Sequence, residues 1–174
     1  RTKFFIGASQ EDFEYDENPI LGGKLDSDEQ GVFVGVEWEA TGKTSGSIRI
    51  GELDKDFDSA GRQDRSSTDW DVQVVWSPRT YSNVFLNASK SPNESNGTGN
   101  FIESQDFSVT WLHAWSEHMT STVSLGTGED EYDGSTRTDD RDSFSVNLAY
   151  DWQRWITVGA GFSRVMVISG VQPD

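Results

Sequence analysis

The stretch Phe107-Ser-Val-Thr-Trp-Leu-His-Ala-Trp115 decides the fold class. Its odd positions hold Phe107, Val109, Trp111, His113 and Trp115, which alternate with Ser108, Thr110, Leu112 and Ala114. A side-chain period of two over nine residues is the pattern of a β-strand with two chemically different faces. Helical periodicity is absent from this stretch, so it predicts a strand.

The same pattern recurs before three other tryptophans, in the segments 32–38, 70–76 and 144–152. Each of Trp38, Trp76, Trp115 and Trp152 is followed by a few turn-type residues and a second, weaker alternating segment. A repeat near 40 residues raises the possibility of a propeller, whose blades pack four short strands into that length. Here each repeat holds two long strands and one long loop, which predicts an array of β-hairpins.

We therefore predict an all-β, single-domain chain over residues 1–174 with about nine strands. The expected strands are 3–9, 30–38, 44–54, 68–76, 81–90, 103–115, 119–128, 142–152 and 155–167. The expected repeat units lie near 30–67, 68–102, 103–141 and 142–167.

Composition excludes several classes of protein. The formal net charge of −16 disfavours binding to nucleic acid, because the chain would repel a phosphate backbone. The chain has no cysteine, so it has no disulfide framework and no thiolate metal site. No apolar run approaches the roughly 20 residues of a membrane helix, but the strands of a membrane barrel show only alternation.

The connections alternate between short and long. The long ones are expected at about 10–29, 55–67, 91–102 and 129–141, and they contain clusters of Asp and Glu. Short turns at one end and long polar loops at the other are typical of outer-membrane barrels, whereas a Greek-key sandwich mixes lengths at both ends. We thus expect an antiparallel, up-and-down transmembrane β-barrel in a bacterial outer membrane. Because such barrels have an even strand number, nine strands predict a piece of a larger barrel.

The barrel hypothesis assigns the two strand faces. Aromatic residues beside the short turns are expected to form a girdle at the membrane interface, in contact with lipid and lipopolysaccharide: Trp38, Trp76, Tyr81, Trp115, Trp152 and Trp155. Polar residues between the apolar positions are expected to face the lumen, among them Arg49, Gln73, Asn83, Asn87, Thr110 and Asn147. Such a lumen would pass a polar solute without catalysis.

Several blocks of sequence resemble the β-barrel porin family that occurs in exopolysaccharide export and biosynthesis loci. The resemblance extends from about Gly31 to Phe162, and its most specific block is Trp76-Ser-Pro-Arg-Thr-Tyr-Ser82. Further blocks are Trp38 to Thr44, Trp111 to Ser116, and Tyr150 with Arg154-Trp155. The resemblance implies an outer-membrane location, a role in moving or housing an exported polysaccharide, and contact with the export machinery. It implies no catalytic residue.

Three other features have functional alternatives. The segment Asp26-Ser-Asp-Glu-Gln-Gly31 nearly fits an EF-hand loop, but a strand follows where a helix is required. We expect no cofactor, with loose divalent-cation binding by the acidic loops as the remaining option. An outer-membrane enzyme would use His113 or His118, which lack a defined partner. A soluble, secreted β-sandwich that binds carbohydrate through exposed tryptophans is the alternative from another class.

Overall fold

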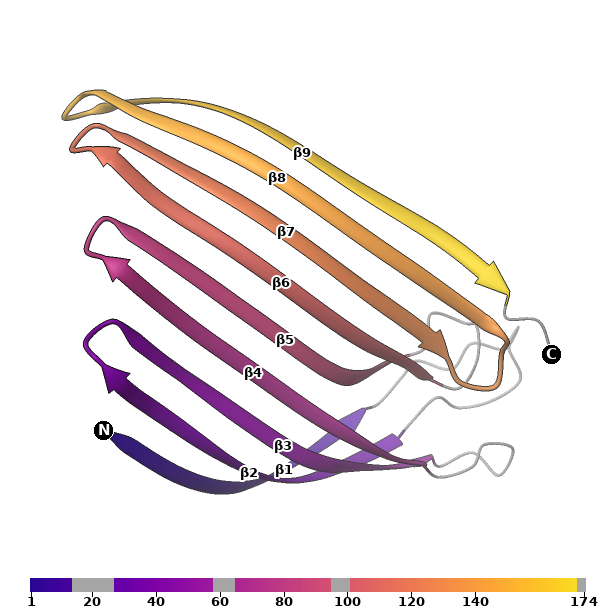
Figure 1. Cartoon of the computed structure of the whole chain (residues 1–174). Helices are drawn as coiled ribbons and strands as arrows, with labels where there is room; N and C mark the ends of the chain where they lie inside the picture. The colour runs from indigo at the N-terminus through magenta and orange to yellow at the C-terminus, as the bar shows by residue number, and fades with distance from the viewer. Residues whose placement is uncertain (14–26, 58–64, 95–100, 172–174) are drawn as a thin grey trace.

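The computed structural model describes residues 1–13, 27–57, 65–94 and 101–171 (Figure 1). Within these ranges the chain is a single antiparallel sheet whose nine strands follow one another in sequence order. The strands are β1 (Thr2–Phe13), β2 (Ser27–Thr41), β3 (Thr44–Phe57), β4 (Arg65–Arg79), β5 (Ser82–Glu94), β6 (Phe101–Ser116), β7 (Met119–Tyr132), β8 (Arg137–Gln153) and β9 (Ile156–Val171). The predicted all-β, up-and-down architecture is confirmed. No helix in the described ranges is long and apolar enough to cross a lipid bilayer.

The four short turns share one construction. Each leaves two residues between its strands: 42–43, 80–81, 117–118 and 154–155. In each hairpin the register shifts just before the turn, as between Ala114 and Ser116. No non-glycine residue in the described ranges has a positive φ. Each register shift adds one residue to one strand beside the turn, so the turn is wider than a tight two-residue hairpin. Bulky turn residues such as Tyr81 and Trp155 therefore avoid the left-handed region.

The strands extend further at the long-loop end than the sequence predicted. The segment 129–141 was expected to be a loop, but β7 continues to Tyr132 and β8 begins at Arg137. Gly134, with φ 78°, lies in the short connection between them. The prediction was wrong because acidic composition alone does not end antiparallel pairing, and Arg141 of β8 bonds Asp130 of β7 across the two strands. The other long loops fall largely on residues 14–26, 58–64 and 95–100, outside the described residues.

Pairing between the strands keeps like side chains on one face. Val34 of β2 stands opposite Ile6 and Ile50, and Val109 of β6 stands opposite Leu86 and Leu125. We call the face of these residues the apolar face, and the opposite one, which includes Arg49, the polar face. A shift by one residue in any pair would exchange the two faces of a strand, so the alternation itself selects this register.

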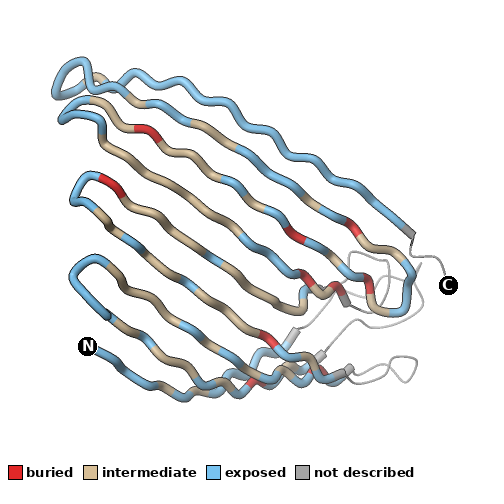
Figure 2. Tube along the Cα trace, in the orientation of Figure 1, coloured by how far each residue is buried: buried red, intermediate tan, exposed pale blue. Residues whose placement is uncertain are grey.

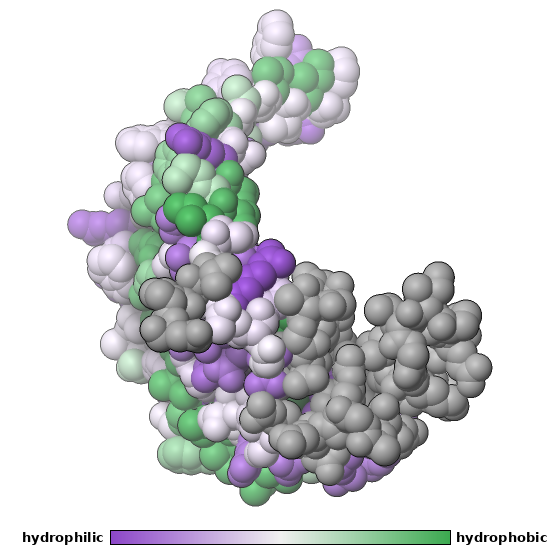
Figure 3. Space-filling view, turned by 90° about the vertical axis from the view of Figure 1, so that its right-hand side faces the viewer, coloured by the Kyte–Doolittle hydropathy of each residue, from purple (hydrophilic) through white to green (hydrophobic). Residues whose placement is uncertain are grey.

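The sheet is curved and open. Seen from the right-hand side of Figure 1, it bends into an arc (Figure 3). The polar face is the concave one: Asp106 of β6 and Arg141 of β8 meet across β7, and most of the exposed large apolar side chains lie on the other face. Accordingly Phe5 on the polar face is half-buried, while its neighbours Phe4 and Ile6 are 83% and 82% exposed. Strands β1 and β9 are the two edges and are not paired with each other in the described ranges.

This sheet has almost no interior of the kind found in a water-soluble domain. Ile102 and Tyr132 are its buried hydrophobic residues in the described part of the chain (Figure 2). Most large apolar side chains are exposed on the convex side, among them Val32, Ile50, Leu125 and Phe162. An apolar surface of this extent has no favourable contact with water, so it requires another apolar phase or partner.

Candidate functional site

Charged side chains of the polar face occupy the same part of the strands as apolar side chains of the opposite face. Arg49 lies between Ile48 and Ile50 in β3, and its Nη2 is 2.8 Å from Oδ2 of Asp69 in β4. Asp71 stands directly opposite Arg49 in the register. Asp69 is buried, and the Arg49 guanidinium bonds it rather than Asp71.

All six residues predicted to face a lumen share this polar face. Arg49 and Gln73 lie on β3 and β4, Asn83 and Asn87 on β5, Thr110 on β6 and Asn147 on β8. The structure brings some of them together with hydroxyl groups: Asn83 Oδ1 accepts from Ser77 Oγ at 2.6 Å, and Thr110 Oγ1 is 3.0 Å from Ser124 Oγ. Strands β5 to β8 thus present a row of amides and hydroxyls.

A second charged cluster lies near the long-loop end of the same face. Arg141 of β8 bonds Asp106 of β6 at 2.9 Å and Asp130 of β7 at 3.1 Å, and Ser104 Oγ donates to Asp130 at 2.5 Å. Whereas Arg49 bonds Asp69 alone, this guanidinium is shared by two carboxylates. Each half of the sheet thus carries an arginine–carboxylate cluster on this face.

Glycines make both clusters possible. A Cβ at Gly51 would overlap Asp69, and a Cβ at Gly128 would overlap Asp106 and touch Arg141. Because the glycine leaves the space over β7 open, side chains from β6 and β8 can meet there. These two glycines are needed for close approach of neighbouring side chains, which sequence spacing alone does not reveal.

Two carboxyl groups at the long-loop end have shifted pKa values. The Arg137 guanidinium, which is hydrogen-bonded to Asp139, lowers the pKa of that carboxyl to about 2, with help from Ser169 and Tyr132. Burial raises the pKa of Glu29, and the ion pair with Lys55 opposes that rise. Asp139 therefore stays ionised at any ordinary pH, whereas Glu29 accepts a proton more easily than a typical glutamate.

Sequence reasoning missed aromatic residues on the polar face. The rings of Phe5 and Phe33 meet edge to face at 6.3 Å, and the Arg49 guanidinium lies 5.4 Å from the centre of the Phe33 ring. Phe5 lies over Gly35 of β2, and Phe33 lies over Gly7 of β1. The signal was available, because each Phe stands opposite a Gly once the first hairpin is placed in register. Asp69 and Asp71 were also missed.

The residues predicted to form a girdle lie at the short-turn end. Trp76, Trp115 and Trp152 are 50%, 57% and 70% exposed, and the turn residues Tyr81 and Trp155 are 50% and 78% exposed. Trp38 is half-buried because its ring lies over Gly46. No bilayer is part of the structure, so their contact with lipid stays a prediction.

His113 lies within this aromatic group. Its ring is 4.4 Å from that of Trp115, 5.1 Å from that of Trp111 and 5.5 Å from that of Tyr81. Its Nδ1 is buried and has no hydrogen-bond partner in the described residues. The two indole groups donate instead to serines: Trp111 to Ser82 and Trp115 to Ser121, both at 2.9 Å. His118 lies in a turn and contacts the ring of Tyr150.

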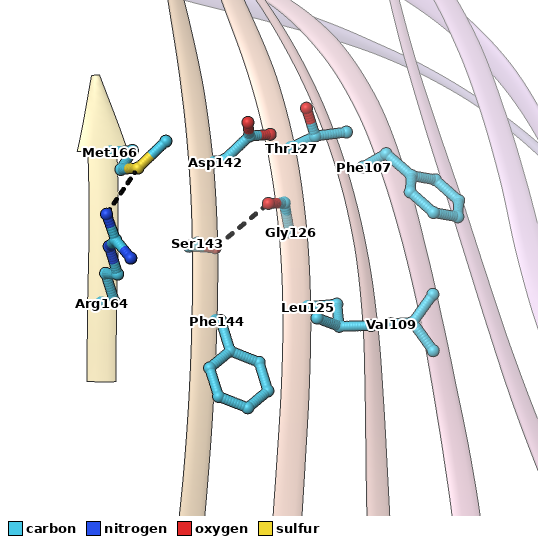
Figure 4. A pocket seen from close by; sticks show the side chains of 10 residues that line it. All are labelled: Phe107, Val109, Leu125, Gly126, Thr127, Asp142, Ser143, Phe144, Arg164 and Met166. Carbon is cyan, nitrogen blue, oxygen red and sulfur yellow. Dashed lines mark hydrogen bonds between the residues drawn. The ribbon is translucent and has the colours of Figure 1, made fainter. Parts of the chain in front are cut away.

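The apolar face carries an open hollow over β6 to β9 (Figure 4). Phe107, Val109, Leu125 and Phe144 line it, and Arg164 and Met166 of β9 lie at one side. The Arg164 guanidinium contacts the Met166 sulfur at 3.1 Å. The hollow is an open gap between exposed apolar side chains.

The EF-hand-like segment does not form a helix–loop–helix unit. Asp26 lies outside the described residues, and Ser27 to Gly31 belong to strand β2. Across the ranges that the structure describes, no three His, Asp or Glu side chains are grouped to hold a metal ion. Loose binding of divalent cations by the acidic loops remains a prediction.

Comparison with known proteins identifies the family. No curated protein matches this chain. The family model described as "Putative beta-barrel porin 2" matches residues 1–173, nearly the whole chain. Its name agrees with the meander of strands and with the division into an apolar and a polar face. The chain belongs to this β-barrel porin family.

Proposed function

We propose that the chain forms the wall of an outer-membrane barrel whose concave polar face conducts a polar solute, including an exported polysaccharide. The convex apolar face contacts lipid, and the short-turn aromatics lie in the headgroup region. Transport is passive: the wall replaces part of the hydration of the solute and performs no chemical step.

One observation carries this proposal, namely charge at the depth of the apolar band. On β8 the apolar face extends from Phe144 to Trp152, eight residue steps or about 26 Å along the strand. Outer-membrane barrels have an apolar band about 25 Å tall. Arg49, Asp69 and Asp71 lie at this depth on the other face, and ionised groups at membrane depth need a water-filled space.

The chemistry of the polar face suits a hydroxyl-rich solute. Asn87, Thr110, Ser124 and Asn147 offer both donors and acceptors to the hydroxyl groups of a sugar. Phe5 and Phe33 add apolar ring surface beside the Arg49–Asp69 pair. A polysaccharide presents the same combination of hydroxyls and apolar C–H faces.

The two other hypotheses have less support. A β-sandwich requires two packed sheets, and the described part of the chain forms one. A hydrolase would need a nucleophile and a carboxylate around a histidine. His113 is instead surrounded by the rings of Tyr81, Trp111 and Trp115. We therefore propose a conduit rather than an enzyme.

The membrane assignment is tested by far-UV circular dichroism and gel filtration in plain buffer and in detergent. We expect a β-type spectrum and a discrete particle in detergent only. A monodisperse β-protein in plain buffer would contradict the membrane assignment.

Transport is tested by swelling of liposomes that contain the protein, with neutral malto-oligosaccharides of increasing length. The variant Asn147→Trp places a large side chain on the polar face and should slow entry of the longer sugars. The control Leu148→Trp makes a similar change one residue away on the apolar face and should leave entry unchanged. Equal rates for wild type and Asn147→Trp, together with similar results for other polar-face variants, would rule out passage along this face.

A further inference from the structure

The charged groups of the polar face are unbalanced. By register, its strand residues include six basic residues: Lys3, Arg49, Lys55, Arg65, Arg137 and Arg141. They also include ten carboxylates: Glu11, Glu29, Glu37, Glu39, Asp69, Asp71, Asp106, Asp130, Asp139 and Asp151. Ten negative charges against six positive ones leave this face with a net charge of −4.

Five of these six basic residues are held by a carboxylate. Lys3 pairs with Glu37, Arg49 with Asp69, Lys55 with Glu29, Arg137 with Asp139, and Arg141 with Asp106 and Asp130. An anion that entered along this face would have to displace a carboxylate to reach any of these five positive charges. These five cations are therefore engaged and are not open to an anionic solute.

Four carboxylates on the same face have no cationic partner among the described residues: Glu11, Glu39, Asp71 and Asp151. Asp71 is the most important of the four because it lies within the part of the strand that carries the apolar band. It lies between Trp70 and Val72, which belong to the apolar face, and opposite Arg49 and Ser89 in the register. Since Arg49 bonds Asp69, the two carboxylates and one guanidinium carry one net negative charge in the middle of the wall.

We propose that the conduit selects by charge: it passes cations and uncharged hydroxyl-rich solutes and excludes anions, acidic polysaccharides among them. This inference rests on the proposed function and specifies its substrate class. A net negative wall in a narrow, low-dielectric channel attracts cations and repels anions, as rings of Asp and Glu do in cation channels. Asp71 is the residue that we expect to contribute most at membrane depth.

The test is the reversal potential of the purified chain in planar bilayers of uncharged lipid under a KCl gradient. Wild type should be cation-selective. Asp71→Asn should lower the cation-over-anion permeability ratio by about two- to fourfold, which is the effect of one unit charge about 10 Å away in water. Asp142→Asn removes the same charge from the apolar-face side of β8 and should leave the ratio unchanged.

The outcomes separate the inference from the proposed function. Conductance with no selectivity, or with anion selectivity, would overturn the inference and leave the conduit intact. An equal effect of Asp71→Asn and Asp142→Asn would show that the wall charge does not set selectivity. Absence of any conductance would overturn the proposed function and the inference together. If Asp71→Asn fails to assemble, the comparison is made with wild-type protein in liposomes, whose swelling is measured with a neutral sugar and with the sugar acid of equal size. Faster entry of the sugar acid would overturn the inference.

Discussion

The division of each strand between lipid and water can be tested with two adjacent residues of β8. Leu148 lies on the apolar face, is 40% exposed, and stands four residues from both Phe144 and Trp152, in the middle of the apolar band. Asn147 is the preceding residue and lies on the polar face opposite Thr122 and Gly161. Arginine at each position introduces the same side chain at nearly the same depth, on opposite sides of the wall.

The two arginine substitutions should lower the free energy of unfolding by very different amounts. An arginine on the lipid face of a barrel at the bilayer midplane costs about 2–4 kcal/mol, whereas substitutions on the lumen face mainly change selectivity. Leu148→Arg should therefore reduce the ratio of folded to unfolded protein by about 30- to 700-fold, at about 1.4 kcal/mol per tenfold. Asn147→Arg should cost less than about 1 kcal/mol, because its guanidinium remains hydrated.

Unfolding by guanidinium chloride in lipid vesicles, followed by the fluorescence of the seven tryptophans, measures both variants. The midpoint should fall strongly for Leu148→Arg and little for Asn147→Arg, with the same slope in denaturant. An equal loss in the two variants would refute the assignment of the faces. A larger loss in Asn147→Arg would mean that the polar face is the one packed against an apolar phase.

Three further predictions concern single contacts. Trp115→Phe removes the indole that donates to Ser121 at 2.9 Å and should lower stability by about 0.5–1.5 kcal/mol in denaturant unfolding, whereas Trp155→Phe, 78% exposed, should have little effect. Gly128→Ala should separate Asp106 from Arg141 and lower the midpoint temperature of thermal unfolding. In the control Gly170→Ala the new Cβ would lie at an ordinary 3.8 Å from the Thr138 carbonyl oxygen, so this midpoint should not change. Equal shifts in the two variants would show that the ion pair over β7 contributes nothing to stability. Because the pKa of Asp139 is lowered to about 2, its ionised form stabilises the fold above about pH 4, and the advantage of wild type over Asp139→Asn should disappear as pH falls to about 2; an unchanged difference over that range would contradict the ion pair with Arg137.

Much of the fold followed from local pattern. Alternation in segments such as Phe107 to Trp115 was enough to predict strands and to divide their residues between two faces, because successive side chains of an extended chain point to opposite sides. The four tryptophan-containing repeats located the short turns for the same reason. All six predicted lumen residues share one face because they occupy the same phase of this alternation.

The contacts between strands depended on the tertiary structure. Asp71 of β4 stands directly opposite Arg49 of β3. The Arg49 guanidinium nevertheless bonds Asp69, which lies two residues before Asp71 in β4. Arg141 reaches past its neighbour β7 to Asp106 on β6, over the space left by Gly128. The alternation of side chains along a strand assigns a residue to a face. It does not say how far a side chain reaches across that face or which neighbouring residue leaves room for it. Register, curvature and the positions of glycines decide those contacts, and with them which charges of the polar face are paired.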